Sequence, residues 1–574
     1  MVEHQLPKLR VAGSNPVIRS SSGSGRAIIT CLIARPDPIS LFADDGTRTR
    51  VEVFGIIGAM AKTPPTADNN APAKYLPIFG ASFLLGLAFD YLLYGEAPGL
   101  SFPIYVILIG IAFFVLATRF KMAPDKSIIL LIIPLVLFSA MVFVRASDFL
   151  TLLNVGITLL FLILIADLVV GRKLKDYFIV DYIKSCFLVP LNALDKFFFA
   201  LSNIPAVLGA AKDRDRTSQI IRGVLLAIPV LFIFILLLSS ADLVFHKYAS
   251  KLIDFRITPE SVVRTFLVLS ATAAFIGTFT YLFIKPARVG DTGAANPDRQ
   301  SLGLIEGSIL LGSVNALFLS FILIQVTYLF GGRRNIAVEG VTYAQYARHG
   351  FFELIAVAAI SFLLIWLTEK YIFRRGEKHA LSFTLFGAAL IVQVIVIMIS
   401  AFKRLALYEG AYGYTVLRFY SHVFIIWLAV VFLLLLVKIL TNEEENFFAL
   451  RMFTSGLIFL AFLNFLNPDA FIARQNIARY KETGKLDAWY LSRLSADAVP
   501  ETIKVLDLKD QELSRDFAAG AYWQWQNGSE PARNWQSTNL SRRYAYHLLS
   551  RRAAFLRHNK DRQPPAGPDS FGMD

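Results

Sequence analysis

The residue types best suited to chemistry gather in two stretches of this sequence, each next to a long apolar run. The first stretch, residues 340–353, carries Tyr343, Tyr346, Arg348, His349 and Glu353. On a helix, Tyr343, Tyr346 and Glu353 share one face, because residues three, four or seven positions apart lie on the same side. The stretch therefore predicts a helix that carries Glu353 into the apolar run, about one turn below His349.

The second stretch, residues 403–422, follows another apolar run and has the same character. If the two stretches meet on the outer side of a membrane, they form one pocket rich in tyrosine and arginine. The alternative is a belt of aromatic residues and snorkelling arginines at the membrane interface, which needs no carboxylates or histidines. The candidate pocket residues are Tyr343, Tyr346, Arg348, Glu353, Arg404, Tyr408, Glu409, Tyr412, Arg418 and His422.

Membrane-spanning helices must position these residues. Of the 574 residues, 55% are apolar and only 17% are charged, whereas soluble chains carry about 25% charged residues. The apolar runs are continuous and approach the roughly 20 residues that a spanning helix needs, which favours helices over a barrel. The fold class is therefore all-α, a polytopic bundle of about eleven spans near residues 75–94, 103–118, 128–144, 149–170, 221–244, 262–284, 304–330, 351–373, 381–402, 418–440 and 447–467.

Three segments differ from this transmembrane domain, which we place at residues 71–467. Residues 1–70 lack periodicity, which predicts disorder, and Met60 is an alternative start of the protein. Residues 171–220 are half apolar with charges at helical spacing, which predicts an amphipathic helix in the membrane interface. Residues 468–574 are polar, rich in arginine and tryptophan, and predict a small helical tail, such as an αα-hairpin near the membrane surface.

The orientation follows from the basic residues of the loops, because cytoplasmic loops are enriched in lysine and arginine. With a cytoplasmic N-terminus, the inner loops hold about twice as many basic residues as the outer loops. An odd number of spans then places the tail outside the cytoplasm. The net charge of +14 fits basic loops that face anionic lipid.

Charged residues at bilayer depth are costly and are candidates for function. Asp167 and Glu306 lie deepest, whereas Asp90, Asp148 and Glu369 fit paired or snorkelling charges near helix ends. Buried amides are expected to join helices by hydrogen bonds; the candidates are Asn154, Asn315, Gln325, Gln393 and Asn464. No nucleotide-binding, metal-binding or nucleic-acid-binding motif is found, so we expect no cofactor, no metal and no nucleic acid partner.

The two stretches and the tail resemble a bacterial membrane-protein family known as domain of unknown function 4173. Residues 340–354 are similar to its "LTYAEYARRGFFEL" signature, with His349 where an arginine is expected, and residues 404–418 to its "RLxLYExAYGxTxLR" segment. Residues 467–500 are similar to its C-terminal signature. The resemblance implies a multi-pass bacterial inner-membrane protein and implies no activity.

Three functions therefore remain open. The leading hypothesis is a non-enzymatic envelope scaffold, sensor or assembly partner that uses the outer stretches and the tail to bind another envelope protein. The second is an ion-coupled transporter with Asp167, Glu306 and Glu353 as coupling carboxylates. The third is a membrane enzyme acting on a lipid-linked substrate, with Glu353 or Glu409 as general base.

Overall fold

The computed structural model describes residues 41–42, 48–49, 71–122, 126–201, 203, 234, 259–284, 304–330, 351–371, 377–528 and 534–562. The chain divides into two units, Met1–Asp68 and Asn69–Asp574. The first unit contains β1 (Leu41–Phe42) and β2 (Arg48–Thr49), which pair antiparallel. The predicted disorder of residues 1–70 and the alternative start at Met60 concern residues outside the described ranges, apart from these two strands.

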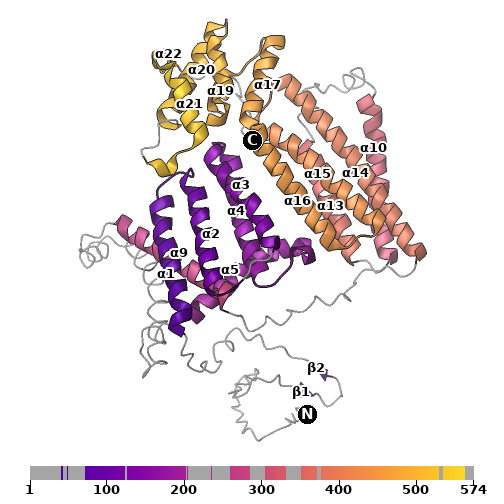
Figure 1. Cartoon of the computed structure of the whole chain (residues 1–574). Helices are drawn as coiled ribbons and strands as arrows, with labels where there is room; N and C mark the ends of the chain where they lie inside the picture. Colours follow the sequence, from indigo (N-terminus) through magenta and orange to yellow (C-terminus); the bar gives the residue numbers. More distant parts are fainter. Residues whose placement is uncertain are drawn as a thin grey trace, which may run out of the picture. The chain divides into compact units, whose positions relative to one another are not determined.

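The second unit is helical, as the sequence predicts (Figure 1). Its apolar helices are α1 (Ala71–Leu93), α2 (Ser101–Arg119), α3 (Lys126–Val144), α4 (Asp148–Val169), α5 (Ile179–Leu201), α9 (Pro259–Phe283), α10 (Leu304–Phe330), α13 (Phe351–Tyr371), α14 (Glu377–Tyr412), α15 (Val416–Thr441) and α16 (Glu445–Leu466), with the 3-10 turn η2 (Leu174–Asp176) before α5. Among the described residues, eight helices are long and apolar enough to cross a membrane. They coincide with eight of the eleven predicted spans, and α3 is a shorter apolar helix.

The helix α5 forms the first half of the predicted interfacial segment. It is not one of the eight candidate spans. Tyr182, Ser185 and Val189 are buried on one side, whereas Phe187 and Leu191 are exposed. Asn203, just after α5, donates a hydrogen bond to the Tyr75 hydroxyl near the start of α1. Residues 204–220 of the segment lie outside the described residues.

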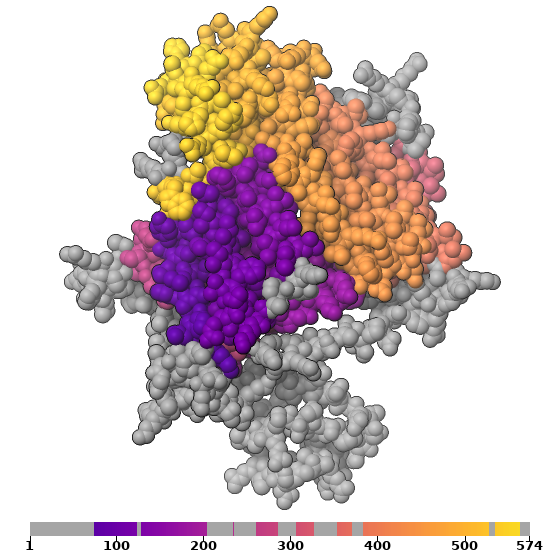
Figure 2. All heavy atoms as spheres, in the orientation of Figure 1, coloured from indigo at the N-terminus to yellow at the C-terminus, as the bar shows by residue number. Residues whose placement is uncertain are grey.

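The segments 468–528 and 534–562 fold into one helical domain, which we call the tail domain (Figure 1). It is larger than the expected αα-hairpin, because a single core draws on most of its helices. Its elements are α17 (Pro468–Thr483), α18 (Ala488–Arg493), η4 (Ala496–Ala498), α19 (Val499–Thr502), η5 (Ile503–Asp507), α20 (Gln511–Trp523), the π-helix η6 (Gln524–Gly528), η7 (Trp535–Ser537), α21 (Leu540–Ser550) and α22 (Ala553–His558). The tail domain lies across the ends of helices from both the indigo-to-purple group and the orange group (Figure 2).

Hydrogen bonds between two buried amides join α4 to α16. Asn154 of α4 and Asn464 of α16 exchange two side-chain hydrogen bonds of 2.8 and 2.9 Å. Further along the same two helices, Phe161 and Phe453 are in ring contact. The predicted role of asparagine as a link between helices is confirmed here, and also at Asn315 of α10, which donates to the Phe386 carbonyl of α14.

Contacts at the two ends of α1 show on which sides of the bundle α5 ends and α9 begins. Asp90, near the end of α1, pairs with Arg264, near the start of α9, at 2.6 Å. Since Asn203 contacts the start of α1, α5 ends on the side opposite the start of α9. Asn203 and Pro259 therefore lie on opposite sides of the bundle. The predicted span 221–244 between them lies outside the described residues, apart from Phe234.

Two glycines let α9 pack closely against its neighbours. A Cβ added to Gly277 of α9 would lie 2.2 Å from the Ala193 carbonyl oxygen of α5. A Cβ added to Gly86 of α1 would lie 2.8 Å from the Val268 carbonyl oxygen of α9. Because backbone atoms cannot yield as a flexible side chain can, only glycine fits these crossings, as is common where helices pack in membranes.

We predict that Gly277→Ala lowers the thermal unfolding temperature of the purified protein in detergent by several degrees, because α5 and α9 must separate, at a cost of about 1–3 kcal/mol. Gly110→Ala is the matched control, since a Cβ there meets nothing within 4 Å, and it should leave that temperature unchanged or raise it slightly. Equal unfolding temperatures for the two variants would contradict the close crossing.

Candidate functional site

The second polar stretch forms a corner rather than a loop. The helix α14 does not end at residue 402, as the sequence analysis predicts, but continues to Tyr412 and carries Arg404, Tyr408 and Glu409 on its last turns. The backbone from Lys403 to Tyr412 stays helical although the sequence turns polar there. The turn itself is short, since Gly413 takes a φ of +86° and Thr415 caps the start of α15.

Two arginines donate hydrogen bonds to the backbone carbonyl oxygens where α14 ends. Arg418 of α15 donates to the Gly413 carbonyl at 2.7 Å, and its guanidinium lies 4.1 Å from the centre of the Tyr408 ring. Arg479 of the tail domain donates to the Gly410 and Ala411 carbonyls. Cations are favourable at the C-terminal end of a helix. Arg418 is thus occupied as a helix cap.

An asparagine of the tail domain holds the same corner. Asn476 of α17 donates to the Tyr414 carbonyl and accepts from the Tyr414 amide, both at 2.8 Å. A Cβ on Gly413 would lie 2.7 Å from the Asn476 side-chain oxygen. Tyr490 accepts the Val416 amide at 2.8 Å, and burial raises the pKa of its hydroxyl to about 12. The tail domain therefore fixes the geometry of the α14–α15 corner.

Below the corner, the buried Glu409 of α14 pairs with the partly exposed His422 of α15. The His422 Nδ1 lies 3.0 Å from Glu409 Oε2, and its Nε2 lies 3.3 Å from the Phe402 carbonyl oxygen. A protonated imidazole satisfies both contacts, because it donates from both nitrogens. Glu409 is 2% exposed, and its Oε1 has no hydrogen-bond partner among the described residues. This carboxylate is the group in the corner best placed for proton chemistry.

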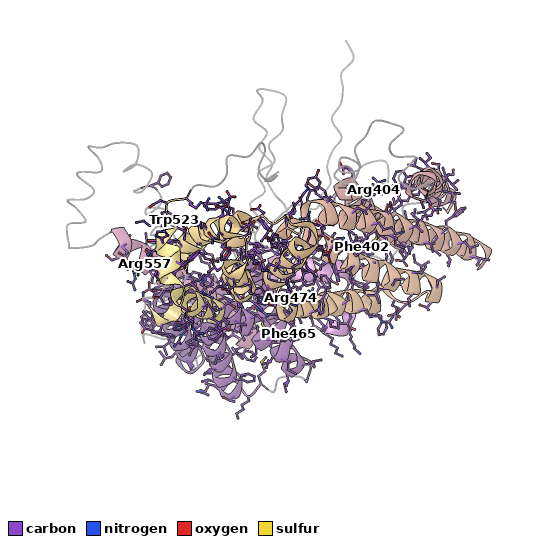
Figure 3. All side chains as sticks on the ribbon, turned by 90° about the horizontal axis from the view of Figure 1, so that it is seen from above. Phe402, Arg404, Phe465, Arg474, Trp523 and Arg557 are labelled. Carbon is purple, nitrogen blue, oxygen red and sulfur yellow. The ribbon has the colours of Figure 1, made fainter. Side chains whose placement is uncertain are left out.

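The other corner residues face outward or lie at the edge. Tyr412 is 56% exposed, and its ring contacts the Tyr408 ring at a centroid distance of 5.0 Å. Arg404 and Phe402 lie at one side of the tail-bearing face, far from Trp523 and Arg557 (Figure 3). Tyr343, Tyr346 and Arg348 lie outside the described residues, so the predicted meeting of the two stretches stays a prediction.

Glu353 is exposed in the first turn of α13. Glu369, near the end of that helix, pairs with Lys438, near the end of α15. Since α15 begins at the corner, the start of α13 lies on the tail-bearing side, about 30 Å from its own end. Glu353 and the corner therefore share one side of the bundle, as expected from the topology.

The predicted intramembrane carboxylates lie near helix ends. Asp167, in the last turn of α4, accepts hydrogen bonds from the Tyr177 and Ser185 hydroxyls and pairs with Arg172 at 3.4 Å. These contacts tie α4 to η2 and α5, which is a structural role. Glu306 is exposed in the first turn of α10.

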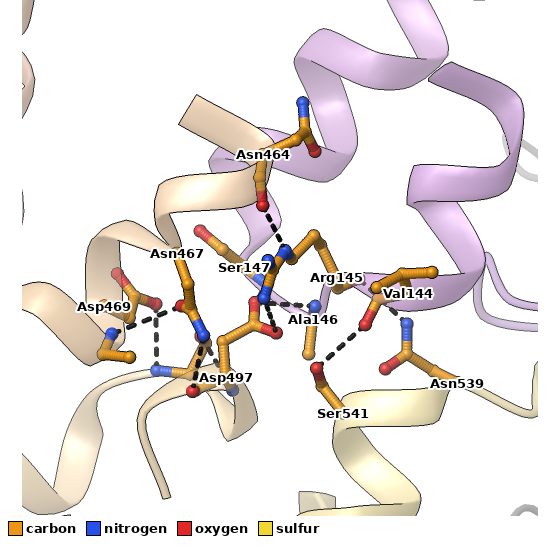
Figure 4. Close-up of polar contacts among 12 residues, drawn as sticks. Val144, Arg145, Ala146, Ser147, Asn464, Asn467, Asp469, Asp497, Asn539 and Ser541 are labelled. Atoms are coloured by element: carbon orange, nitrogen blue, oxygen red, sulfur yellow. Dashed lines mark hydrogen bonds and ion pairs between the residues drawn. The ribbon is translucent and has the colours of Figure 1, made fainter. Parts of the chain in front are cut away.

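A group of polar contacts between the α3–α4 turn and the tail domain forms what we call the docking joint (Figure 4). Asp497, 2% exposed, accepts the Ala146 and Ser147 amides at 2.8 Å each and lies 3.8 Å from the Arg145 guanidinium. Arg145 also donates to the Asn464 carbonyl at 2.6 Å. One carboxylate thereby satisfies two backbone donors at the start of α4.

The carbonyl groups at the end of α3 are satisfied by the start of α21. Asn539 caps α21 and also donates to the Val142 and Arg145 carbonyls. Ser541 donates to the Val144 carbonyl at 2.8 Å. Three carbonyls that a helix end leaves unpaired thus receive donors from the tail domain.

A second contact lies over the α1–α2 turn. Glu96 accepts hydrogen bonds from Asn534 and Ser537, and the Leu100 amide donates to the Thr538 carbonyl at 2.8 Å. A Cβ on Gly99 would lie 2.6 Å from the Thr538 carbonyl oxygen. The turn and the tail domain therefore touch backbone to backbone.

A third acidic residue marks the boundary between α16 and the tail domain. Asp469, 3% exposed, accepts the Ser495 amide at 3.3 Å. Burial is the main reason that its pKa lies above the usual range, and the negative charge of Asp497 adds to this effect. Since the pKa is raised by folding, the ionised form of Asp469 opposes folding at neutral pH.

Sequence reasoning missed three buried charged residues as site candidates, namely Lys438, Asp469 and Asp497. Lys438 is 2% exposed within α15, with its ammonium group against Glu369 of α13 and 5.9 Å from the centre of the Phe448 ring. A single lysine inside the apolar run 418–440 was the available signal. For Asp497 the available signal was its place in the C-terminal signature, residues 467–500, which gave the residue no role. Among the described residues no three histidine, cysteine, aspartate or glutamate side chains gather as metal ligands would.

A comparison with models of protein families shows to which family the chain belongs. The model of a domain of unknown function, DUF4153, matches residues 132–505. The protein belongs to the DUF4153 family. A membrane family of unknown function is what the motifs indicated, but the matching family is DUF4153 and not the family 4173 that they resembled. The matched region includes the α14–α15 corner and the Asp497 contacts of the docking joint, but it ends before Asn539 and Ser541. No curated protein and no solved structure matches the chain.

In this DUF4153 protein, we predict that Asp497→Ala loosens the docking joint. It leaves two buried amides without an acceptor and should cost about 2–4 kcal/mol. The direct measurement is hydrogen exchange, which should accelerate at Ala146 and Ser147. Asp507→Ala is the matched control, because the Asp507–Arg552 pair is exposed and should contribute no more than about 1 kcal/mol. Unchanged protection in Asp497→Ala would contradict the joint.

We also predict that Glu369→Gln and Lys438→Met each destabilise the DUF4153 bundle by about 3–5 kcal/mol, because each leaves one buried charge without its counterion. The double variant should recover most of that loss. Thermal unfolding of the four proteins gives the coupling energy of the pair. Losses that simply add in the double variant would show that the two charges do not interact.

Proposed function

We propose that this DUF4153 protein is a non-enzymatic membrane scaffold that holds its tail domain over one side of the helical bundle and presents it to another envelope protein. The observation that carries the proposal is the docking joint. Asp497 and Asn539 replace water as hydrogen-bond partners of the ends of α3 and α4. A domain held by buried backbone contacts keeps one orientation relative to the membrane, which is what a scaffold requires.

The corner supports the same function. Three candidate site residues, Tyr408, Arg418 and Glu409, are engaged in contacts that shape the α14–α15 corner. The tail domain grips this corner through Asn476 and Arg479. Residues that first suggested a ligand pocket thus shape the corner that the tail domain contacts.

The membrane side of the tail domain is part of the proposal. The loops at the opposite ends of α2 and α4 carry the basic residues Arg119, Lys121, Arg172, Lys173 and Lys175. Basic loops favour the cytoplasm. We therefore propose that the protein lies in a bacterial inner membrane with its tail domain on the outer side, where an envelope partner would meet it.

Ion-coupled transport is the second candidate, and it rests on Glu409 rather than on the carboxylates first considered. Asp167 is engaged by Tyr177, Ser185 and Arg172, whereas Glu409 is buried with one oxygen that has no hydrogen-bond partner among the described residues. A buried carboxylate beside a histidine is a plausible proton carrier. An enzyme would need the same carboxylate as its general base.

The scaffold is tested with a photoreactive amino acid at Trp523, an exposed position of the tail domain. In native membranes, we expect one discrete protein adduct, which persists in Asp507→Ala and disappears in Asp497→Ala. The competing function is measured in vesicles that contain the purified protein, by recording currents after a rapid pH change. A current that Glu409→Gln abolishes, without any adduct at Trp523, would replace the scaffold by a transporter.

A further inference from the structure

The tail domain exposes an aromatic and cationic surface close to the spanning helices. Its apolar members are Trp535, Leu540 and Tyr544, which are 44%, 51% and 55% exposed. Side chains of this size are normally covered in a soluble domain. We propose that this surface, which we call the rim surface, lies in the headgroup layer of the bilayer and binds anionic phospholipid.

The first argument is continuity with the lipid-facing side of α1. The Trp535 ring contacts the Tyr91 ring at a centroid distance of 6.4 Å, and Gln536 donates to the Tyr91 carbonyl. Tyr91 is 61% exposed near the end of a candidate span. Leu84 and Leu87, on the same side of α1, are also exposed. Trp535 therefore extends a surface that faces lipid tails.

The second argument is the height at which α21 begins. Asn539 and Ser541, in the first turn, donate to carbonyls at the end of α3. Leu540, between them, consequently lies at the level of the α3–α4 turn, where the candidate span α4 begins. Tryptophan and tyrosine favour this level of a membrane, because the ring is apolar and its polar group stays hydrated.

The third argument is the composition of the exposed face of α21. Leu540 and Tyr544 are one turn apart, and Arg543, His547 and Arg551 lie beside them at spacings of three and four residues. All five are exposed, whereas Ala545 and Leu549, on the opposite side, are fully buried in the core of the tail domain. Apolar rings flanked by cations are typical of helices that lie on anionic membranes. A protein partner would not require this position at the rim of the bundle.

The test uses the full chain in vesicles whose phosphatidylcholine carries bromine near the headgroup end of its acyl chains, since bromine quenches tryptophan on contact. Trp366 and Trp427, on spanning helices, are first replaced by phenylalanine. In that background, we expect Trp535→Phe to remove most of the quenched emission. Trp523→Phe is the matched control, because Trp523 is also exposed, at 59%, but its ring contacts Tyr522 of its own helix rather than a spanning helix. This variant should remove only emission that bromine does not quench.

The charged part of the rim surface is tested by adding phosphatidylglycerol to the vesicles. Anionic lipid should raise the unfolding temperature of the unmodified protein, and Arg543→Gln with Arg551→Gln should abolish most of that increase. Arg515→Gln is the control, because Arg515 is exposed on α20 and bonded to Gln511 of the same helix. Emission from Trp535 that bromine does not quench would overturn the proposal. So would an equal loss of the lipid effect in Arg515→Gln.

Discussion

A membrane helix must hydrogen-bond every backbone group that lipid or protein covers, and this requirement is hardest to meet where the helix ends. In this protein the tail domain meets it for several helices at once. Asp497 accepts the amides at the start of α4, and Asn539 and Ser541 donate to the carbonyls at the end of α3. Arg479 does the same for the end of α14. The bundle and the tail domain therefore depend on the same contacts.

Most of the charged residues discussed for the bundle link structural elements through ion pairs. Asp90 pairs with Arg264, Glu369 with Lys438, and Asp167 with Arg172 and two hydroxyls. Each pair links two elements near a helix end, where the penalty for a charge is smaller than at mid-bilayer. Glu409 differs, since its partner His422 satisfies one oxygen and the other has no hydrogen-bond partner within the part of the chain that the structure describes.

Membership in the DUF4153 family names no reaction, so the chemistry must be argued from the molecule. The molecule offers a rigid platform and a domain held on it. Polar contacts at the joint face the bundle, whereas the aromatic residues Trp523, Trp535 and Tyr544 of the tail domain are exposed. Fixing one domain by three different turns of the bundle is a mechanical property, and it agrees better with presentation of a surface than with movement of a solute.

Hydrophobic periodicity and length determined the helical class and the positions of most spans, because roughly 20 apolar residues in a row have few other stable states in lipid. A role for Asn154 and Asn464 in joining helices was also foreseen, since a buried amide needs a partner, but their pairing with each other was not. Tertiary structure alone decided the rest. The continuation of α14 to Tyr412 depends on Arg418 and Arg479, which come from later in the chain. The importance of Asp497 depends on amides 351 and 350 residues away, and no local pattern in a sequence records a contact at that separation.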